Sequence, residues 1–160
     1  MNRSIESVLR FVNLTASGLL AGSLGFGEKA LVPGWRNELP LHRDRIQHPI
    51  AALKSIDYFN AIGPLALGTA VTLAVAARDT RRIKRVLDAA TAVGLAGVLA
   101  ATIMVTVPIN RELEQQAPTD YPSDRSQSLA RNWSRAHAMR TTLGISAFVC
   151  AVASSVAPKK

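Results

Sequence analysis

The segment AATAVGLAGVLAATIMVTVPIN, residues 89–110, has 22 consecutive residues without a charged side chain. An α-helix needs about 20 such residues to cross the hydrocarbon core of a bilayer. Three further charge-free runs cover residues 11–27, 58–77 and 141–158, with 17, 20 and 18 residues. Four such runs in 160 residues predict an all-α integral membrane four-helix bundle, and they disfavour the alternative of a soluble protein with buried helices.

The predicted membrane domain is a single unit of residues 1–160, with spans at residues 7–30, 56–77, 87–109 and 137–157. The chain is 48% hydrophobic but only 5% aromatic, and this richness in small aliphatic residues is typical of closely packed membrane helices. The only cysteine lies in the last apolar run, which predicts a packing role and excludes an intramolecular disulfide.

The first apolar run has an alternative interpretation as a cleaved signal peptide. Arg3 and Arg10 precede it, and the small residues Ala21-Gly22-Ser23 resemble a cleavage site. The run continues beyond them through Phe26, which favours a retained membrane span.

Basic residues predict the orientation. Five of them fall within residues 78–85, and together with the two chain ends this side carries nine basic and three acidic side chains. The other side carries ten basic side chains diluted by eight acidic ones over two longer segments. We therefore expect a multi-pass protein of the cell membrane with both termini in the cytoplasm. The net charge of +8 is then mainly a topology signal, with membrane lipid rather than nucleic acid as the partner.

The two extracytoplasmic segments, about residues 28–57 and 111–136, are long for connections in a bundle, and such loops are often functional. Within the second segment, residues 126–140 have the pattern of a helix, so the fourth helix is expected to begin outside the lipid.

Polar residues at the edges of the spans are the candidate site residues, because polar groups are expensive to bury in lipid. Trp133, His137 and Arg140 have the spacing of one helix face. The alternative is that Arg140 extends to the lipid headgroups while Trp133 lies at the membrane interface.

Three more candidates fall at the same end of the predicted bundle. Asn60 precedes Pro64, Asn110 follows Pro108, and Glu28 ends the first span. Pro108 is expected to end the third helix, because proline lacks the N–H group that a helix interior needs. The cytoplasmic end offers only Asn13 and a solvated basic loop, so we predict that the polar groups gather at the extracytoplasmic end alone.

Metal and nucleotide chemistry have little support in the sequence. His42, His48 and His137 form no HxxxH pair and no carboxylate–histidine helix motif, so no metal is expected. A site that combines these histidines with Glu28 is the remaining metal alternative. Haem ligation by two histidines is disfavoured because only His137 lies near a span.

Two stretches together resemble the anthrone-oxygenase-like family of small four-span membrane proteins, which is largely a domain of unknown function. They are VPINRELE, residues 107–114, and RNWSRAHAMRT, residues 131–141. The family pattern of V-P-x-N after the third span and W-x-x-x-[HN]-x-x-R entering the fourth is matched by six residues: Val107, Pro108, Asn110, Trp133, His137 and Arg140.

The resemblance implies oxidation of a small lipophilic aromatic by O₂ without a bound organic cofactor. His137 would be the base, since the ordinary pKa of histidine is about 6.5. Arg140 and Asn110 would stabilise the oxyanion, and Trp133 would stack on a planar substrate, with Asn60 and Glu28 as further binding residues. Two alternatives stay open: a non-catalytic membrane protein that binds a lipophile or a partner protein, and a transporter component that acts as a homo-oligomer.

Overall fold

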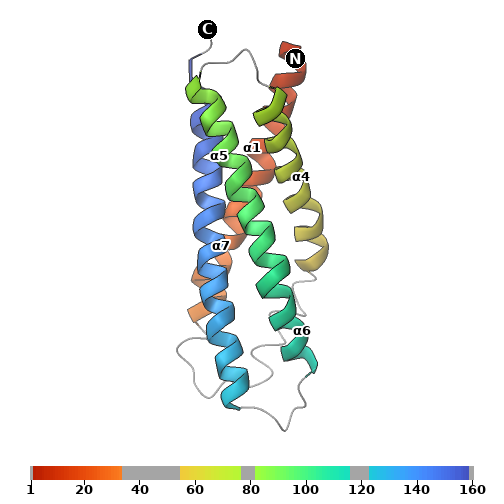
Figure 1. Cartoon of the computed structure of the whole chain (residues 1–160), viewed down its shortest axis with the longest axis vertical. Coiled ribbons are helices and arrows are strands. Elements are labelled where there is room, and N and C mark those ends of the chain that lie inside the picture. Colours follow the sequence, from red (N-terminus) through yellow and green to blue (C-terminus); the bar gives the residue numbers. More distant parts are fainter. Residues whose placement is uncertain (1, 34–54, 77–81, 116–122, 159–160) are drawn as a thin grey trace.

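The fold is a bundle of long helices (Figure 1), here in a computed structural model that describes residues 2–33, 55–76, 82–115 and 123–158. Its elements, in chain order, are α1 (Arg3–Phe26), η1 (Gly27–Leu31), α4 (Ser55–Ala76), α5 (Arg82–Ala101), η2 (Thr102–Thr106), α6 (Val107–Gln115) and α7 (Asp124–Val156). Residues 34–54 of the first predicted segment between spans, and residues 116–122 of the second, lie outside the described residues. The rest of the second segment is described, and most of it forms the end of α6 and the start of α7.

The all-α prediction is confirmed for the described ranges, in which four helices are long and apolar enough to cross a membrane. Both chain termini lie at one end of the bundle, with the start of α5 (Figure 1), and we call this the termini end. The opposite end, where α1 gives way to η1, α6 ends and α7 begins, is called the loop end. The predicted helix over residues 126–140 is confirmed as the first half of α7.

The helix starts follow from local sequence. The Asn2 side chain accepts a hydrogen bond from the backbone of Ser4 at 3.0 Å and so caps α1. Ser123 and Ser126 form a reciprocal capping box that starts α7 outside its apolar part. Helix α4 continues through Pro64.

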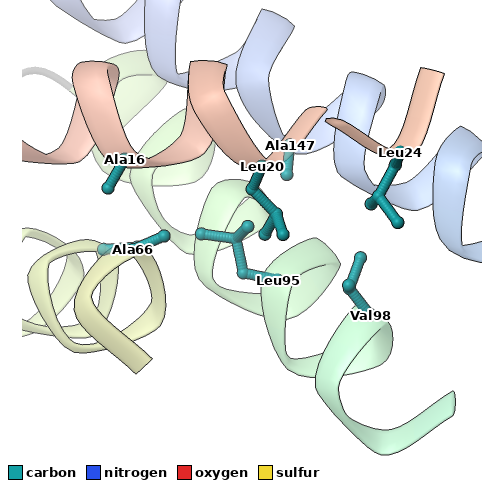
Figure 2. Packing of buried hydrophobic residues seen from close by; sticks show 8 residues of the cluster. Ala16, Leu20, Leu24, Ala66, Leu95, Val98 and Ala147 are labelled. Carbon is teal, nitrogen blue, oxygen red and sulfur yellow. The ribbon is translucent and has the colours of Figure 1, made fainter. Parts of the chain in front are cut away.

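The interior of the bundle is built from small and medium apolar side chains. One cluster joins Ala16, Leu20 and Leu24 of α1 to Ala66, Leu95, Val98 and Ala147 of the other three long helices (Figure 2). Gly94 of α5 lies so close to α7 that an added Cβ would be 3.0 Å from the Cβ of Ala147. Many large apolar side chains point outward instead, with Phe11 70% and Met104 75% exposed. This inverted pattern is the one expected of helices whose outer faces contact lipid.

The third predicted helix does not end at Pro108, so the prediction that this proline ends the helix is wrong. The π-helical turn η2 precedes Pro108, and the chain then continues helically as α6 to Gln115. A π-turn adds one residue to the hydrogen-bonded ring. Pro108 is thereby the second residue of α6, within its first turn, where a missing N–H group is tolerated.

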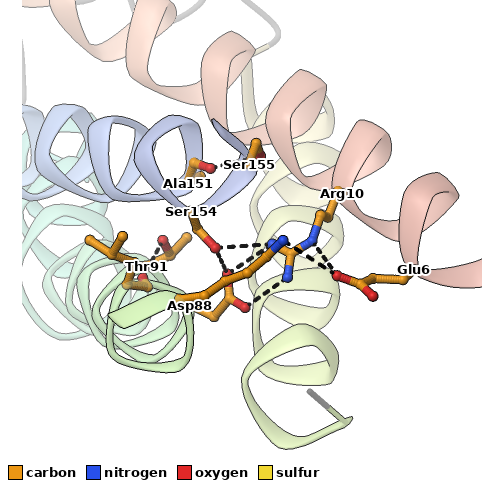
Figure 3. A network of polar contacts seen from close by, with 9 residues as sticks. Glu6, Arg10, Asp88, Thr91, Ala151, Ser154 and Ser155 are labelled. Atoms are coloured by element: carbon orange, nitrogen blue, oxygen red, sulfur yellow. Dashed lines mark hydrogen bonds and ion pairs between the residues drawn. The ribbon is translucent and has the colours of Figure 1, made fainter. Parts of the chain in front are cut away.

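The prediction that polar groups gather at only one end is also wrong. At the termini end, Arg10 of α1 forms a two-pronged ion pair with Asp88 of α5, with Nη1–Oδ1 and Nη2–Oδ2 distances of 3.1 and 3.0 Å (Figure 3). Ser154 of α7 hydrogen-bonds to both partners, and Glu6 accepts from Arg10 Nε at 2.8 Å. Lys84, expected in a solvated loop, is 2% exposed and lies 3.7 Å from Glu6.

Candidate functional site

His137 is held at the loop end by contacts on two sides. Its ring stacks on that of Trp133, with centroids 4.9 Å apart and an interplanar angle of 6°. Its Nε2 atom lies 3.1 Å from the carbonyl oxygen of Leu24 in the last turn of α1. The hydroxyl of Thr141, one turn further along α7, donates to the same carbonyl at 3.3 Å. The backbone of α1 therefore fixes the position of the imidazole.

The contact with Leu24 also decides which ring nitrogen carries the proton. A carbonyl oxygen can only accept, so Nε2 must donate, and in the neutral ring Nδ1 then holds the lone pair. Nδ1 is buried and has no hydrogen-bond partner among the residues that the structure describes. The geometry thus presents an unoccupied basic nitrogen inside the bundle.

Asn110 and Trp133 are joined directly across α6 and α7. The indole Nε1 donates to Asn110 Oδ1 at 2.9 Å. Because the amide oxygen is used by the indole, the amide NH₂ group of Asn110 remains as a donor. Trp133 is buried in an apolar cluster whose other members are Val32, Ile109, Leu113, Leu129 and Ala130. With one face covered by His137, the indole mainly positions its two polar neighbours.

Arg140 points into the bundle. It is only 5% exposed, which excludes the alternative of a side chain extended to the headgroups. Its Nη1 atom donates to the hydroxyl of Thr106, the last residue of η2, at 3.1 Å. Its Nε atom is buried and has no partner within the described ranges of the chain.

The other two predicted site residues differ in their placement. Glu28 lies in η1, next to Gly27, and its Oε2 atom is buried with no partner among the described residues. Asn60 is exposed on α4, and no hydrogen bond joins it to the described part of the site. The structure therefore brings Asn110 and His137 each into direct contact with Trp133 and leaves Asn60 apart from them.

The metal alternative depends on His42 and His48, which lie outside the described residues. Within the four described ranges, no group of three or more His, Cys, Asp or Glu side chains is placed to hold a metal ion.

Sequence reasoning missed four positions that hold the site together: Leu24, Gly27, Thr106 and Thr141. Gly27 and Thr106 lie in π-helical turns, which occur mostly as short insertions and often at functional sites. Leu24 contributes its backbone carbonyl, so the identity of its side chain could not indicate this role.

Gly27 is required for the position of His137, and its replacement by alanine is expected to break the bond to Leu24. A Cβ atom there would lie 2.8 Å from His137 Nε2 and 3.0 Å from Cε1, closer than van der Waals contact allows. We expect a loss of about 1 kcal/mol in unfolding free energy and a population of the other tautomer. ¹⁵N NMR of histidine-labelled protein, with His137→Gln to assign the signals, measures the tautomer.

Gly25→Ala is the matched control, because an added Cβ at Gly25 meets nothing within 4 Å. Both variants gain the same helix propensity, so their difference isolates the clash. An unchanged His137 spectrum in Gly27→Ala would contradict the positioning role.

Together, the fold and these contacts define a class: four apolar helices with a buried polar site at one end. Residues 55–150, more than half of the chain, match the anthrone oxygenase family, and the protein belongs to that family. The matched region contains Asn110, Trp133, His137 and Arg140, whereas Leu24, Gly27 and Glu28 precede it. Comparison with curated proteins and with solved structures found no match.

Proposed function

We propose that the protein oxidises a small lipophilic aromatic of the anthrone type with O₂ at the loop-end site. The observation that carries the proposal is the set of three buried side-chain atoms without partners among the described residues: Glu28 Oε2, His137 Nδ1 and Arg140 Nε. A buried polar group left unpaired costs about 1–3 kcal/mol, and more when charged. A site that keeps three such groups is poised to bind a ligand, whereas a purely structural cluster would pair them internally.

The first step that we propose is removal of a proton from the substrate methylene by His137. The carbonyl across the ring acidifies this C–H bond, because it accepts the electron pair as an enolate oxygen. The proton goes to Nδ1, the nitrogen with the lone pair, while Nε2 stays bonded to Leu24. Arg140 and the NH₂ group of Asn110 stabilise the negative oxygen.

The second step is the reaction of the electron-rich anion with O₂. Electron transfer and radical recombination form a C–O bond at the former methylene carbon and give a peroxide anion. The imidazolium of His137 returns its proton to this peroxide. Loss of the second C–H proton and cleavage of the O–O bond then give the quinone carbonyl and one water. One O₂ is consumed for each anthrone, and no bound organic cofactor is needed.

A non-catalytic membrane protein that binds a lipophile or a partner protein is the second candidate. The observation that favours it is the hydrogen bond between Asn110 and Trp133, whose ring also stacks on His137, since this bond would link α6 to α7 without any chemistry. In both cases we propose that the protein lies in the cell membrane with both termini in the cytoplasm. A homo-oligomer is compatible with either function.

The test is turnover by the purified full-length protein in lipid nanodiscs. With 1,8-dihydroxyanthrone as probe, we expect a kcat of about 1 s⁻¹ or more, in the usual range for enzymes. An oxygen electrode and quinone absorbance should report equal amounts of O₂ consumed and quinone formed. Empty nanodiscs and heat-denatured protein give the rate of spontaneous oxidation. A rate no higher than theirs would reject the oxidase and leave the binding candidate.

A further inference from the structure

Arg140 is a buried cation that has no counter-ion among the residues that the structure describes. The only hydrogen-bond partner that the described residues give it is the neutral hydroxyl of Thr106, and no carboxylate among them lies within 4.0 Å. Arg10, also inside the bundle, is by contrast paired with both Asp88 and Glu6. The exposed Arg125 is paired with Glu112 as well. Within the described ranges, Arg10 and Arg125 are therefore paired with carboxylates and Arg140 is not.

A guanidinium cannot escape this situation by losing its proton, because it stays charged under all conditions relevant to proteins. Burial of an unpaired charge is strongly unfavourable, and in membrane helices such charges are usually functional. Arg140 therefore requires an anion from outside the described chain.

The edge of the Arg140 guanidinium that is not bonded to Thr106 indicates which kind of anion would fit. Thr106 occupies Nη1, which leaves the edge formed by Nε and Nη2 without a partner among the described residues. Two parallel N–H groups on one edge suit a planar oxyanion, such as a carboxylate or an ionised phenol. His137 lies one turn earlier on α7 and its ring stacks on Trp133, so two aromatic rings share a helix face with Arg140.

We propose that the loop-end site selects aromatic molecules that carry an acidic oxygen, and that they bind as anions paired with Arg140. This inference names the substrate class of the site in the proposed function. It implies that the charge is present before the reaction begins, on a carboxylate or an acidic phenol of the ring system. A neutral aromatic of the same size would leave Arg140 unpaired and would bind weakly.

The experiment compares two fluorescent probes of nearly equal shape, 9-anthracenecarboxylate and the neutral 9-anthracenemethanol. Both are titrated against the full-length protein in phosphatidylcholine nanodiscs, with empty nanodiscs to subtract partition into lipid. We expect the carboxylate to bind at least about 10-fold more tightly, a difference typical of one desolvated charge pair. Equal affinities for the two probes would overturn the proposal.

Variants assign the preference to Arg140. Arg140→Gln should remove the 10-fold preference and leave the affinity for the neutral probe within about 2-fold. Arg140→Lys keeps the charge without the two-pronged edge, so it should retain part of the preference for the carboxylate. It is the variant to measure if Arg140→Gln does not fold. Arg135→Gln, an exposed arginine on the same helix, is the matched control and should bind like the wild type. A loss of preference in Arg135→Gln equal to that in Arg140→Gln would contradict the assignment.

Two further measurements show whether the natural anion is an aromatic acid or a lipid headgroup, and whether anthrones bind at the same site. If phosphatidylglycerol in the nanodiscs weakens binding of the carboxylate 10-fold or more, a lipid headgroup is the natural anion and the aromatic-acid proposal fails. A 1,8-dihydroxyanthrone competition arm shows whether phenols enter the same site. Neither probe has the acidic ring methylene of an anthrone, so the binding measurement does not depend on turnover. A preference for the carboxylate without anthrone oxidation would reject only the proposed oxidase. Anthrone oxidation without that preference would reject only the anion-binding inference.

Discussion

Replacement of His137 by alanine is expected to lower kcat for anthrone oxidation about 10²–10⁴-fold, the usual contribution of a general base. The variant removes the ring nitrogen Nδ1, which is buried and has no hydrogen-bond partner among the described residues, one turn before Arg140 on α7. Proton abstraction would then depend on water, and the rate would approach that of empty nanodiscs. Stopped-flow absorbance of the anthrone and its quinone measures the rate.

His137→Gln separates the chemistry from the packing. A glutamine amide can still donate to the Leu24 carbonyl and can still lie against Trp133, but it cannot accept the substrate proton. We therefore expect it to be as inactive as the alanine variant while keeping wild-type thermal stability more closely. Arg135→Ala, which changes an exposed side chain two residues away, should retain full activity. Wild-type turnover in His137→Ala would disprove the role of the base.

The long helices could be predicted from the sequence because their signal is local. Each charge-free run meets the length that a bilayer imposes, whichever neighbours it packs against. The shared face of Trp133, His137 and Arg140 is equally local, since it follows from spacing along one helix. The structure places all three on α7 as buried side chains.

What could not be predicted depends on contacts between distant segments or on backbone atoms. The Leu24 carbonyl meets His137 across 113 positions of sequence, and the closeness of Gly27 to the imidazole follows from the π-turn η1. The π-turn before Pro108 let the helix continue where the proline alone indicated an end. The position of Asn60 before Pro64 predicts a site residue, yet Asn60 lies on an exposed face of α4.

The ion pair at the termini end was missed for the same reason. Arg10 and Asp88 lie at the edges of charged segments, where an exposed position is the ordinary expectation for each. Only the packing of α1 against α7, and of α7 against α5, buries them together with Ser154 (Figure 3). Such a pair cannot be predicted from the sequence of either segment alone.

Replacement of Asp88 by alanine is expected to destabilise the folded protein by about 3–5 kcal/mol, the usual cost of removing one member of a buried ion pair. Asp88 is 3% exposed and receives two hydrogen bonds from Arg10 and one from Ser154. Without it, Arg10 keeps Glu6 but loses its two-pronged partner, so a largely buried charge is left incompletely paired. Unfolding in mixed micelles with rising sodium dodecyl sulfate measures the change.

A double-mutant cycle distinguishes the charge pair from simple packing. Arg10→Met combined with Asp88→Leu removes both charges and fills the space with apolar atoms, which is often nearly neutral for a buried pair. We therefore expect the double variant to be more stable than Asp88→Ala alone, with a coupling energy of about 1–3 kcal/mol between the two positions. Arg85→Ala, an exposed arginine on α5, is the control and should change stability by less than about 0.5 kcal/mol. Additive effects at the two positions would mean that Arg10 and Asp88 do not stabilise each other. The termini end would then be held by the apolar contacts of α1, α5 and α7 alone.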